Sequence, residues 1–377
     1  MGHDVITSIV VNYRCASLTC RAVESLLADM PQAPIVVVDN SVDTDEAAVL
    51  RASLPSQARL VLSPHNIGFG AACNLGVQES DTDYVMLLNP DARIFPGCLE
   101  QLKSALDADA TLGAVSPLQY WDTSKEWMLP PAWLPTGPGL VAVEQAWRSG
   151  RWASQLSLAY RRHAIATWAG KENPVEQRAL SGGAMMVRLS ALSSDDNLFD
   201  PSFFMYYEDS DLSLRLKRHG RKLALITRAA ALHEWENTPG KASLMEASQV
   251  IYLEKHFHSQ RLWQARRTRL AARRPPLENP LNAQVLESEQ RFLDVPRPWQ
   301  SRWLLELSPS PLMIPTIGHL GSGPIARLPL ELLKRFRDCP AYVRIGPVEK
   351  AGDSSLLTFV ARPYADQLDV DVSACAE

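Results

Sequence analysis

Short runs of β-branched residues alternate with helical patterns over the first hundred residues, and this alternation constrains the fold most. The predicted strands are 5–11, 35–38, 58–62 and 84–88, and the predicted helices are 17–27, 45–53, 70–77 and 97–106. Strands that alternate with helices form a mostly parallel sheet covered by helices on both faces. We therefore expect a Rossmann-like α/β fold in which ligands bind at the carboxyl ends of the strands.

Length and composition restrict the class of protein. The 377 residues suffice for one large domain and one small one. A net charge of −4 gives no bulk attraction to nucleic acid, so we expect no nucleic-acid partner. The six cysteines are scattered without a Cys-x-x-Cys pair, which is typical of reduced thiols. A strand follows Met1 almost directly, and no apolar run reaches the roughly 20 residues of a membrane span. We therefore expect a cytoplasmic protein.

The pattern changes after the first hundred residues. Trp and Pro alternate among arginines in 121–176, which predicts a long, partly helical insertion. This insertion is either a packed surface subdomain or a lid that faces an acceptor or a membrane. A closing helix predicted at 243–258 would end a first domain spanning 1–258. Residues 259–295 would form a basic helical segment and linker, and 296–377 a small α+β domain of mainly antiparallel strands.

A basic run stands inside the predicted linker. Six arginines occur from Arg261 to Arg274 with no acid between them, interleaved with Trp263 and Leu270. Such a run is usually a solvated helix face. The alternative is a peripheral anchor to anionic lipid, which would hold the protein on the inner face of the cell membrane.

Polar residues follow the second and third predicted strands. Asp39 ends the second strand, where its carboxylate can accept the imide N–H of a uracil or thymine ring, and Tyr13 can stack on that ring. The alternative is that the acid simply begins a turn. The segment 66–70 contains Asn66 and Gly68, and its glycines permit close backbone approach to a ligand and leave helix N–H groups for an anion.

Asn89 and Asp91 follow the very apolar strand 84–88. An amide oxygen and a carboxylate two residues apart can face the same side, which suits Mg²⁺ or Mn²⁺ that also takes ligands from phosphates. His233 follows a later strand and could complete the ligand sphere or touch the diphosphate. A lone histidine is more often structural, so that alternative stays open.

An aromatic run meets three carboxylates in the segment 203–215. Glu208, Asp209 and Asp211 stand there at the start of a predicted helix. Apolar aromatic surroundings keep a carboxylate partly desolvated and move its pKa toward neutrality, as a general base requires. The alternative is that these acids only favour the first turn of the helix.

In this order and spacing, the segments resemble glycosyltransferase family 2, of the GT-A fold, over about residues 5 to 258. The matching segments are Val10–Tyr13, Val37–Asn40, Asn66–Gly70, Leu88–Ala92, Ser181–Ala184 and Tyr207–Leu212, with His233 downstream. The asparagine-containing metal motif and the aromatic–acid segment look most like the bacterial rhamnosyltransferase-like branch. Where the family usually has Asp-x-Asp, this chain has Asn89-Pro90-Asp91 and supplies one negative ligand.

The resemblance implies a role for each matching residue. Asp209 would be the general base on the acceptor hydroxyl, supported by Glu208 and Asp211. A divalent metal, Mn²⁺ or Mg²⁺, would bind Asp91 and His233. The residues expected at the nucleotide sugar are Tyr13, Asp39, Asn66, Gly68, Asn89, Asp91, Gly182 and Gly183.

The implied reaction is a metal-dependent, inverting sugar transfer. We expect L-rhamnose to pass from dTDP-L-rhamnose to a saccharide or a polyprenyl-diphosphate-linked acceptor in bacterial surface-polysaccharide assembly, such as that of O-antigen. One alternative is the same fold with a UDP-hexose or UDP-N-acetylhexosamine donor. Another is a nucleotide-sugar-binding or scaffold protein without turnover, against which the intact Asp91 and Asp209 argue.

Overall fold

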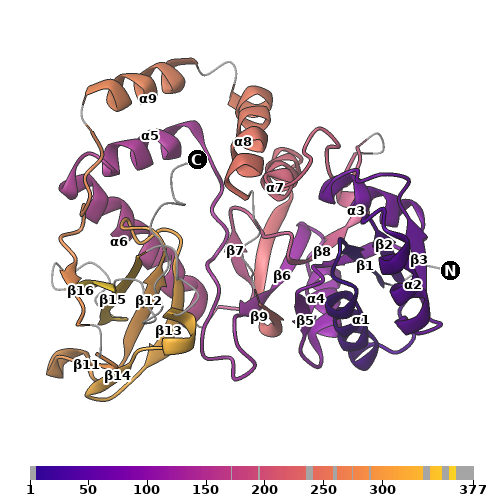
Figure 1. Cartoon of the computed structure of the whole chain (residues 1–377), viewed down its shortest axis with the longest axis horizontal. Coiled ribbons are helices and arrows are strands. Elements are labelled where there is room, and N and C mark those ends of the chain that lie inside the picture. Colours follow the sequence, from indigo (N-terminus) through magenta and orange to yellow (C-terminus); the bar gives the residue numbers. More distant parts are fainter. Residues whose placement is uncertain are drawn as a thin grey trace. The chain divides into compact units, whose positions relative to one another are not determined.

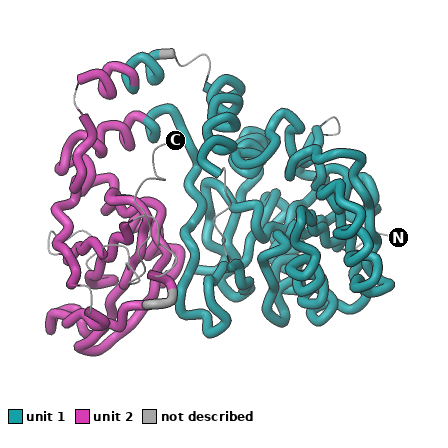
Figure 2. The backbone as a smooth tube through the Cα atoms, in the orientation of Figure 1, with its two compact units in different colours: residues 1–140, 170–267 teal, residues 141–169, 268–377 magenta. Residues whose placement is uncertain are grey.

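The computed structural model describes residues 6–170, 172–193, 196–234, 241–257, 261–273, 275–287, 290–333, 340–349 and 356–361 (Figure 1). The chain forms two compact units, residues 1–140 with 170–267 and residues 141–169 with 268–377 (Figure 2). Each unit is built on its own main sheet.

The first unit contains a nine-stranded sheet in the order β3-β2-β1-β4-β8-β6-β9-β5, with β7 paired to β9. Its strands are β1 Ile6–Asn12, β2 Ile35–Asp39, β3 Ala58–Leu62, β4 Tyr84–Leu88, β5 Ala92–Ile94, β6 Leu112–Tyr120, β7 Val175–Gln177, β8 Ala184–Arg188 and β9 Lys222–His233. Strands β1 to β4, β6 and β9 share one direction, and β5, β7 and β8 run opposite to them. The mostly parallel sheet expected from the alternating pattern is confirmed.

Helices cover both faces of this sheet (Figure 1). They include α1 Ala16–Asp29, α2 Thr44–Ser53, α3 Phe69–Gln78, α4 Cys98–Ala108 and α7 Glu208–Arg218. A further helix, α8 Lys241–Phe257, contacts α7 and the segment before it. Alternate residues of β1 point to opposite faces. Val10 packs with α1 and α4 in one hydrophobic core, and Val11 packs with α3 and α7 in the other. Because both faces are covered, every residue of β1 is buried.

The register brings the polar strand ends to one edge of the sheet. Asn12 pairs with Asp39 where β1 and β2 end. The backbone N–H of Asn89, just after β4, donates to the carbonyl of Gly183, just before β8 (2.9 Å). His233 ends β9, another strand of the same direction. These are the carboxyl ends of parallel strands, where ligands bind in sheets of this kind.

The second unit contains a five-stranded sheet in the order β10-β16-β15-β12-β13 and a two-stranded ribbon, β11-β14. Its elements are α6 Gly150–Ala169, β10 Gln284–Val285, β11 Phe292–Asp294, β12 Trp303–Ser308, β13 Ile317–Gly321, β14 Ile325–Arg327, α10 Leu330–Leu333, β15 Ala341–Pro347 and β16 Leu357–Ala361. All pairs except β10 with β16 are antiparallel. The further small domain of mainly antiparallel strands is confirmed.

Helix α6 falls in this second unit, whereas the sequence suggested an insertion of the first domain over 121–176. Buried charges account for the difference. The guanidinium groups of Arg161, on α6, and Arg344, on β15, both pair with the buried carboxylate of Glu306 on β12. Partners so far apart in the chain cannot be recognised from the composition of the insertion.

Two further helices lie at the borders of the units, α5 Gly137–Ala146 and α9 Arg261–Arg273. The predicted basic run therefore forms a helix, and Arg274 lies outside the described residues. Leu262 is 84% exposed, and Arg266, Arg269 and Arg273 are exposed as well. Within the described ranges, no helix has both the length and the apolar character of a membrane span.

Candidate active site

A buried carboxylate lies beside an exposed ring at the ends of β1 and β2. Asp39 Oδ1 accepts hydrogen bonds from Asn12 Nδ2 (3.0 Å) and from the Ser41 backbone N–H (3.1 Å). Tyr13 is 48% exposed, and the Arg14 guanidinium lies 5.6 Å from the centre of its ring. The arrangement can pair with the edge of a nucleobase and stack on its face.

The loop after β3 is fixed to the end of β2 and to the segment before α7. Asn40 Nδ2 donates to Asn66 Oδ1 (2.8 Å), which also accepts the Gly68 N–H (3.1 Å). Gly68 has φ +84°, and a Cβ at this position would clash with the Phe204 carbonyl oxygen. The Phe69 N–H donates to that same oxygen (2.8 Å). Only glycine therefore allows the loop this close approach.

Asp91 and His233 lie together, with 3.3 Å between Oδ1 and Nε2. The other ring nitrogen, Nδ1, lies 2.9 Å from Gln119 Oε1. Because an amide oxygen only accepts, Nδ1 carries a hydrogen, and Nε2 is the ring nitrogen that faces Asp91. A histidine that donates from its far nitrogen to a carbonyl has the usual geometry of a metal ligand.

The donor set here fits a divalent cation that shares its coordination with a substrate. Asp91 supplies one carboxylate and His233 one nitrogen. Asn89 Oδ1 is buried and has no hydrogen-bond partner within the described part of the chain. In that same part, no three His, Cys, Asp or Glu side chains cluster as metal ligands. The remaining ligands would be phosphate oxygens, which Mg²⁺ commonly takes.

Gly182 and Gly183 connect this cation end of the site to the carboxylates of α7. A Cβ at Gly183 would clash with the ring of His233. The Gly182 N–H donates to Asp209 Oδ2 (3.3 Å). The two glycines therefore bring Asp209 and the Asp91–His233 pair to the same part of the sheet edge.

Asp209 is partly exposed in the first turn of α7. Besides the Gly182 N–H, its carboxylate accepts the Ser210 backbone N–H (2.6 Å). Burial raises the pKa of Asp209, and these backbone donors oppose the rise because they favour the charged form. A reachable carboxylate held by fixed donors is suited to act as a general base.

Glu208 is more deeply placed, with 6% exposure, and lies against Gly70 of α3. Its Oε2 has no hydrogen-bond partner among the residues that the structure describes. Burial and the adjacent Asp209 charge raise the pKa of Glu208 to about 8. At neutral pH it is therefore a carboxylic acid without charge.

Asp211 turns into the protein and is fully buried. Its oxygens accept hydrogen bonds from His256 Nε2 (2.7 Å), Lys255 Nζ (2.7 Å) and Arg215 Nε (2.8 Å). Arg218 donates to His256 Nδ1 (2.8 Å), so the ring hydrogen sits on Nε2. Burial alone would raise the pKa of Asp211, but these donors lower it to about 2. Its contacts fix α7 rather than meet a substrate.

Helix α8 braces the strained segment before α7. Tyr206 and Tyr207 have backbone φ angles of +70° and +68°, which residues other than glycine rarely adopt. Ser248 Oγ donates to the Met205 carbonyl (2.7 Å), and Gln249 Nε2 donates to the Tyr207 hydroxyl (2.6 Å). Strained backbone persists only where its surroundings hold it, and here one face of α8 does so.

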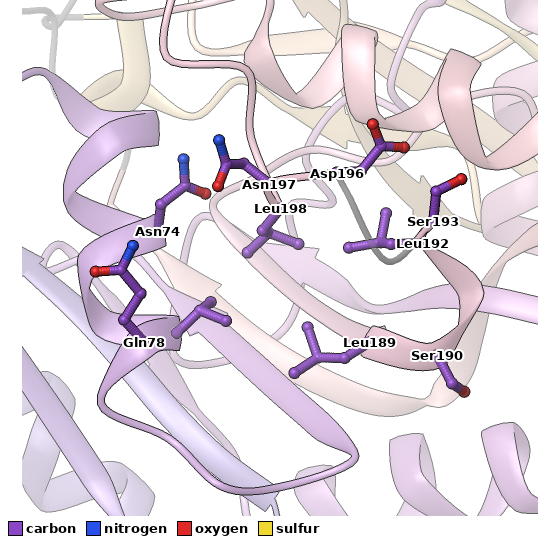
Figure 3. A pocket seen from close by; sticks show the side chains of 10 residues that line it. Asn74, Gln78, Leu189, Ser190, Leu192, Ser193, Asp196, Asn197 and Leu198 are labelled. Atoms are coloured by element: carbon purple, nitrogen blue, oxygen red, sulfur yellow. The ribbon is translucent and has the colours of Figure 1, made fainter.

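A pocket of about 450 Å³ lies elsewhere in the first unit, between α3 and the segment 189–198 (Figure 3). None of the predicted site residues lines it. Asn74 at its wall makes hydrogen bonds to the backbone of Phe199 through both amide atoms (2.7 and 2.9 Å). The pocket is therefore separate from the strand-end site. The Asn74 side-chain amide in its wall holds the backbone of Phe199 in place.

Several polar residues of the site were not predicted. They are Gln119, Lys255 and His256. Gln119 lies 114 residues from its partner His233, and His256 lies 45 residues from Asp211. Local sequence patterns do not predict contacts between residues so far apart in the chain. Asn12, in contrast, ends a buried strand beside Asp39, and its position at a strand end was a usable signal.

Comparison with known proteins gives a family and several relatives. The model of the family described as Glycosyl transferase family 2 matches residues 7–153. An N-acetylglucosaminyl-diphospho-decaprenol L-rhamnosyltransferase of Mycobacterium tuberculosis is 30% identical over 258 residues, which cover 63% of this chain and 78% of the relative. The succinoglycan biosynthesis protein ExoO of Rhizobium meliloti is 30% identical over 114 residues, 30% of this chain and 33% of that protein.

Two solved structures are also similar. GalNAc-T7 with UDP, GalNAc and Mn²⁺ matches with a TM-score of 0.42 and 17% identity, covering 62% of this chain and 46% of that one. TarS 1–349 of S. aureus in complex with UDP-GlcNAc matches with a TM-score of 0.42 and 14% identity, covering 62% of this chain and 60% of that one.

Proposed function

This chain belongs to glycosyltransferase family 2, and we propose that it transfers L-rhamnose from dTDP-L-rhamnose to a polyprenyl-diphosphate-linked saccharide. The observation that carries the proposal is Asp209, a partly exposed carboxylate held by backbone N–H groups beside the Asp91–His233 pair. The similarity to the L-rhamnosyltransferase of M. tuberculosis supports L-rhamnose as the transferred sugar and a lipid-linked acceptor. The similarity to ExoO supports a place in surface-polysaccharide assembly.

The nucleotide of the donor would bind at the ends of β1 and β2. Asp39 would accept the imide N–H of the thymine ring, and Tyr13 would stack on the ring. The loop with Asn66 and Gly68 lies next to them and brings backbone close to the ligand. A uracil ring presents the same imide, so these contacts alone do not select between dTDP and UDP donors.

The diphosphate would lie near Asn89, Asp91 and His233, with the backbone of Gly182 and Gly183 close by. Asp91 and His233 would hold a divalent cation, Mn²⁺ or Mg²⁺, whose role when bound is to neutralise charge on the leaving nucleoside diphosphate. Gln119 would keep His233 in the tautomer that leaves Nε2 available. Addition of EDTA should stop transfer, and Mn²⁺ or Mg²⁺ should restore it; full activity after exhaustive chelation would contradict a metal role.

Asp209 would take the proton from the acceptor hydroxyl as that oxygen attacks the anomeric carbon. The new glycosidic bond forms on the face opposite the diphosphate, and the bond to the diphosphate breaks with its electron pair. One displacement of this kind inverts the anomeric configuration and needs no nucleophile on the enzyme. Glu208, uncharged at neutral pH, would support Asp209 without competing for the proton. Asp211 would hold α7 in place.

A panel of nucleotide sugars tests the donor. Thermal stability is measured with dTDP-L-rhamnose, UDP-hexoses and UDP-N-acetylhexosamines. A ligand present at a hundredfold its Kd raises the free energy of unfolding by about 2.7 kcal/mol. We expect the largest shift with dTDP-L-rhamnose, and transfer of rhamnose to a polyprenyl-diphosphate-linked N-acetylglucosamine. If the enzyme transferred sugar only from a UDP sugar, dTDP-L-rhamnose would not be its donor. Binding without transfer or donor hydrolysis would instead indicate a scaffold protein.

Helix α9 would bring the enzyme to the cytoplasmic face of the membrane, where lipid-linked acceptors are held. Each exposed arginine of α9 would attract anionic lipid with about 1 kcal/mol near the membrane surface. The exposed Leu262 would add an apolar contact. The test is flotation with anionic liposomes across a salt series, comparing wild type with a variant in which Arg266, Arg269 and Arg273 are replaced by Gln. Salt-sensitive flotation of wild type alone is expected, and failure of wild type to float at low salt would refute the contact.

A further inference from the structure

Lys241 stands at the start of α8 and belongs to none of the roles assigned above. Its side chain is half-buried, and Nζ lies 5.7 Å from the centre of the Tyr206 ring. Burial lowers the pKa of Lys241, and the charge of Asp91 opposes that change. The ammonium group therefore lies over Tyr206, two residues before α7, and the charge of Asp91 acts on it.

The helix fixes this position. Residues seven apart lie on the same face of an α-helix, so Lys241 shares a face with Ser248. Ser248 holds the Met205 carbonyl, next to the strained Tyr206, with a hydrogen bond of 2.7 Å. The face of α8 that braces the segment before α7 therefore also presents Lys241 toward Tyr206.

Charge balance indicates what such a lysine can do. The motif Asn89-Pro90-Asp91 contributes one carboxylate, so one divalent cation beside it leaves much of the negative charge of a diphosphate unbalanced. A lysine ammonium is a compact point charge and a common phosphate ligand. The aromatic face of Tyr206 attracts the same cation and can position it before a donor arrives.

We propose that Lys241 binds the diphosphate of the nucleotide-sugar donor and remains with it as the nucleoside diphosphate leaves. The contact makes and breaks no covalent bond. It would supply positive charge from α8, in addition to the charge of the cation held by Asp91 and His233. This inference rests on the proposed function and assigns a further donor-binding residue to the same site.

The test compares ligands with and without phosphates. The affinity for dTDP is measured by titration calorimetry and that for thymidine by ligand-observed NMR, in wild type and Lys241→Met. Because hydrogen bonds to charged groups are the strong ones, we expect Lys241→Met to weaken dTDP binding by roughly 10- to 100-fold and to leave thymidine binding unchanged. Lys241→Arg keeps the charge and should retain most of the dTDP affinity.

Lys222→Met is the matched control. It removes the same charge from an exposed site at the start of β9, the strand that His233 ends, and should bind dTDP like wild type. Equal dTDP affinity in wild type and Lys241→Met would overturn the inference and leave the proposed function standing. An equal loss for thymidine and dTDP would overturn it too, because Lys241 would then act through packing. If wild type binds neither dTDP nor UDP, the proposed function itself fails.

Discussion

The first turn of α7 and the interior of the second unit both bury carboxylates, and they treat them in opposite ways. In the second unit, Glu306 is fully buried and both its oxygens pair with the guanidinium groups of Arg161 and Arg344. In the first turn of α7, Glu208 has a buried oxygen without a hydrogen-bond partner in the described structure, and Asp209 is held by backbone N–H groups. Burial is common to both regions, and the supply of positive partners differs.

The supply of charged donors decides which carboxylates can take part in proton transfer. A carboxylate saturated by charged donors stays ionised and inert, whereas one that is desolvated with few donors has a raised pKa and can accept a proton near neutrality. Asp211 shows the same contrast within α7 itself. It lies two residues from Asp209, but three basic side chains lower its pKa to about 2. The number and charge of the partners, more than burial, separate Asp209, the proposed base, from the structural carboxylates Asp211 and Glu306.

The largest effect is expected from Asp209→Asn, which removes the carboxylate proposed as the base. We expect transfer to fall by roughly 10²–10⁴-fold, the usual cost of losing a positioned general base. Binding of the nucleoside diphosphate should remain, because the proposed contact of Asp209 is with the acceptor and not with the donor. Steady-state transfer and calorimetry measure the two effects. Asp81→Asn, exposed at the opposite end of β4, is the control; turnover near wild type in Asp209→Asn would remove this residue from the mechanism.

The structural counterpart is Glu306→Gln. Removing one partner of a buried ion pair leaves uncompensated charge, and we expect the free energy of unfolding to fall by about 3–5 kcal/mol. Urea unfolding of the purified variant measures this loss. Glu349→Gln, an exposed change in the same unit, should be close to neutral. Unchanged stability in Glu306→Gln would mean that the buried charges in the second unit are not held as the contacts indicate.

A smaller effect, on metal affinity, is expected from changing Gln119, the hydrogen-bond partner of the proposed metal ligand His233. Gln119→Leu removes the carbonyl that accepts the His233 Nδ1 hydrogen, and such changes typically weaken metal binding by roughly 10- to 100-fold. Mn²⁺ titration followed by electron paramagnetic resonance, with dTDP present, gives the affinity directly. Gln119→Glu retains an acceptor and should bind Mn²⁺ more tightly than Gln119→Leu. Identical affinities in wild type and Gln119→Leu would exclude a role for this hydrogen bond.

The smallest effect concerns Glu208 and pH. The pKa of Glu208 rises from 4.5 to about 8 in the folded chain, so the native state binds more protons than the unfolded state between these values. Stability from this group is therefore complete at low pH and is lost progressively as pH rises through that window.

Glu208→Gln removes this dependence because its amide stays uncharged. We expect the thermal midpoint of the variant to fall less than that of wild type from about pH 5 to pH 8, by a few degrees. Transfer near neutral pH should be retained, since the amide resembles the protonated acid. Parallel midpoint curves for the two proteins would show that Glu208 is ionised in the native state at neutral pH.

The fold of the first unit could be predicted from the sequence because its signals are local. The strand expected at 84–88 is β4, Tyr84–Leu88, and the helix expected at 45–53 is α2, Thr44–Ser53. Turn residues and periodic apolar positions define such elements within a few neighbours. The expected placement of polar residues at strand ends followed from the same reasoning.

Other features depend on contacts between distant residues. The pairing of Arg161 with Glu306 joins residues 145 apart, and it places α6 with the C-terminal sheet. The brace of α8 on the segment before α7, and the tautomer of His233 set by Gln119, are of the same kind. Each requires the positions of two elements in space, which local patterns do not contain.

The stereochemistry of the product shows whether transfer is a single displacement with Asp209 as the base. Purified enzyme is supplied with dTDP-L-rhamnose and a polyprenyl-diphosphate-linked N-acetylglucosamine, and the anomeric configuration of the transferred sugar is determined by NMR. A single displacement by an acceptor hydroxyl that Asp209 deprotonates predicts a product inverted at the anomeric carbon relative to the donor. A product that retains the donor's configuration would exclude a one-step displacement from the face opposite the diphosphate, and with it the role of Asp209 as the base of that step.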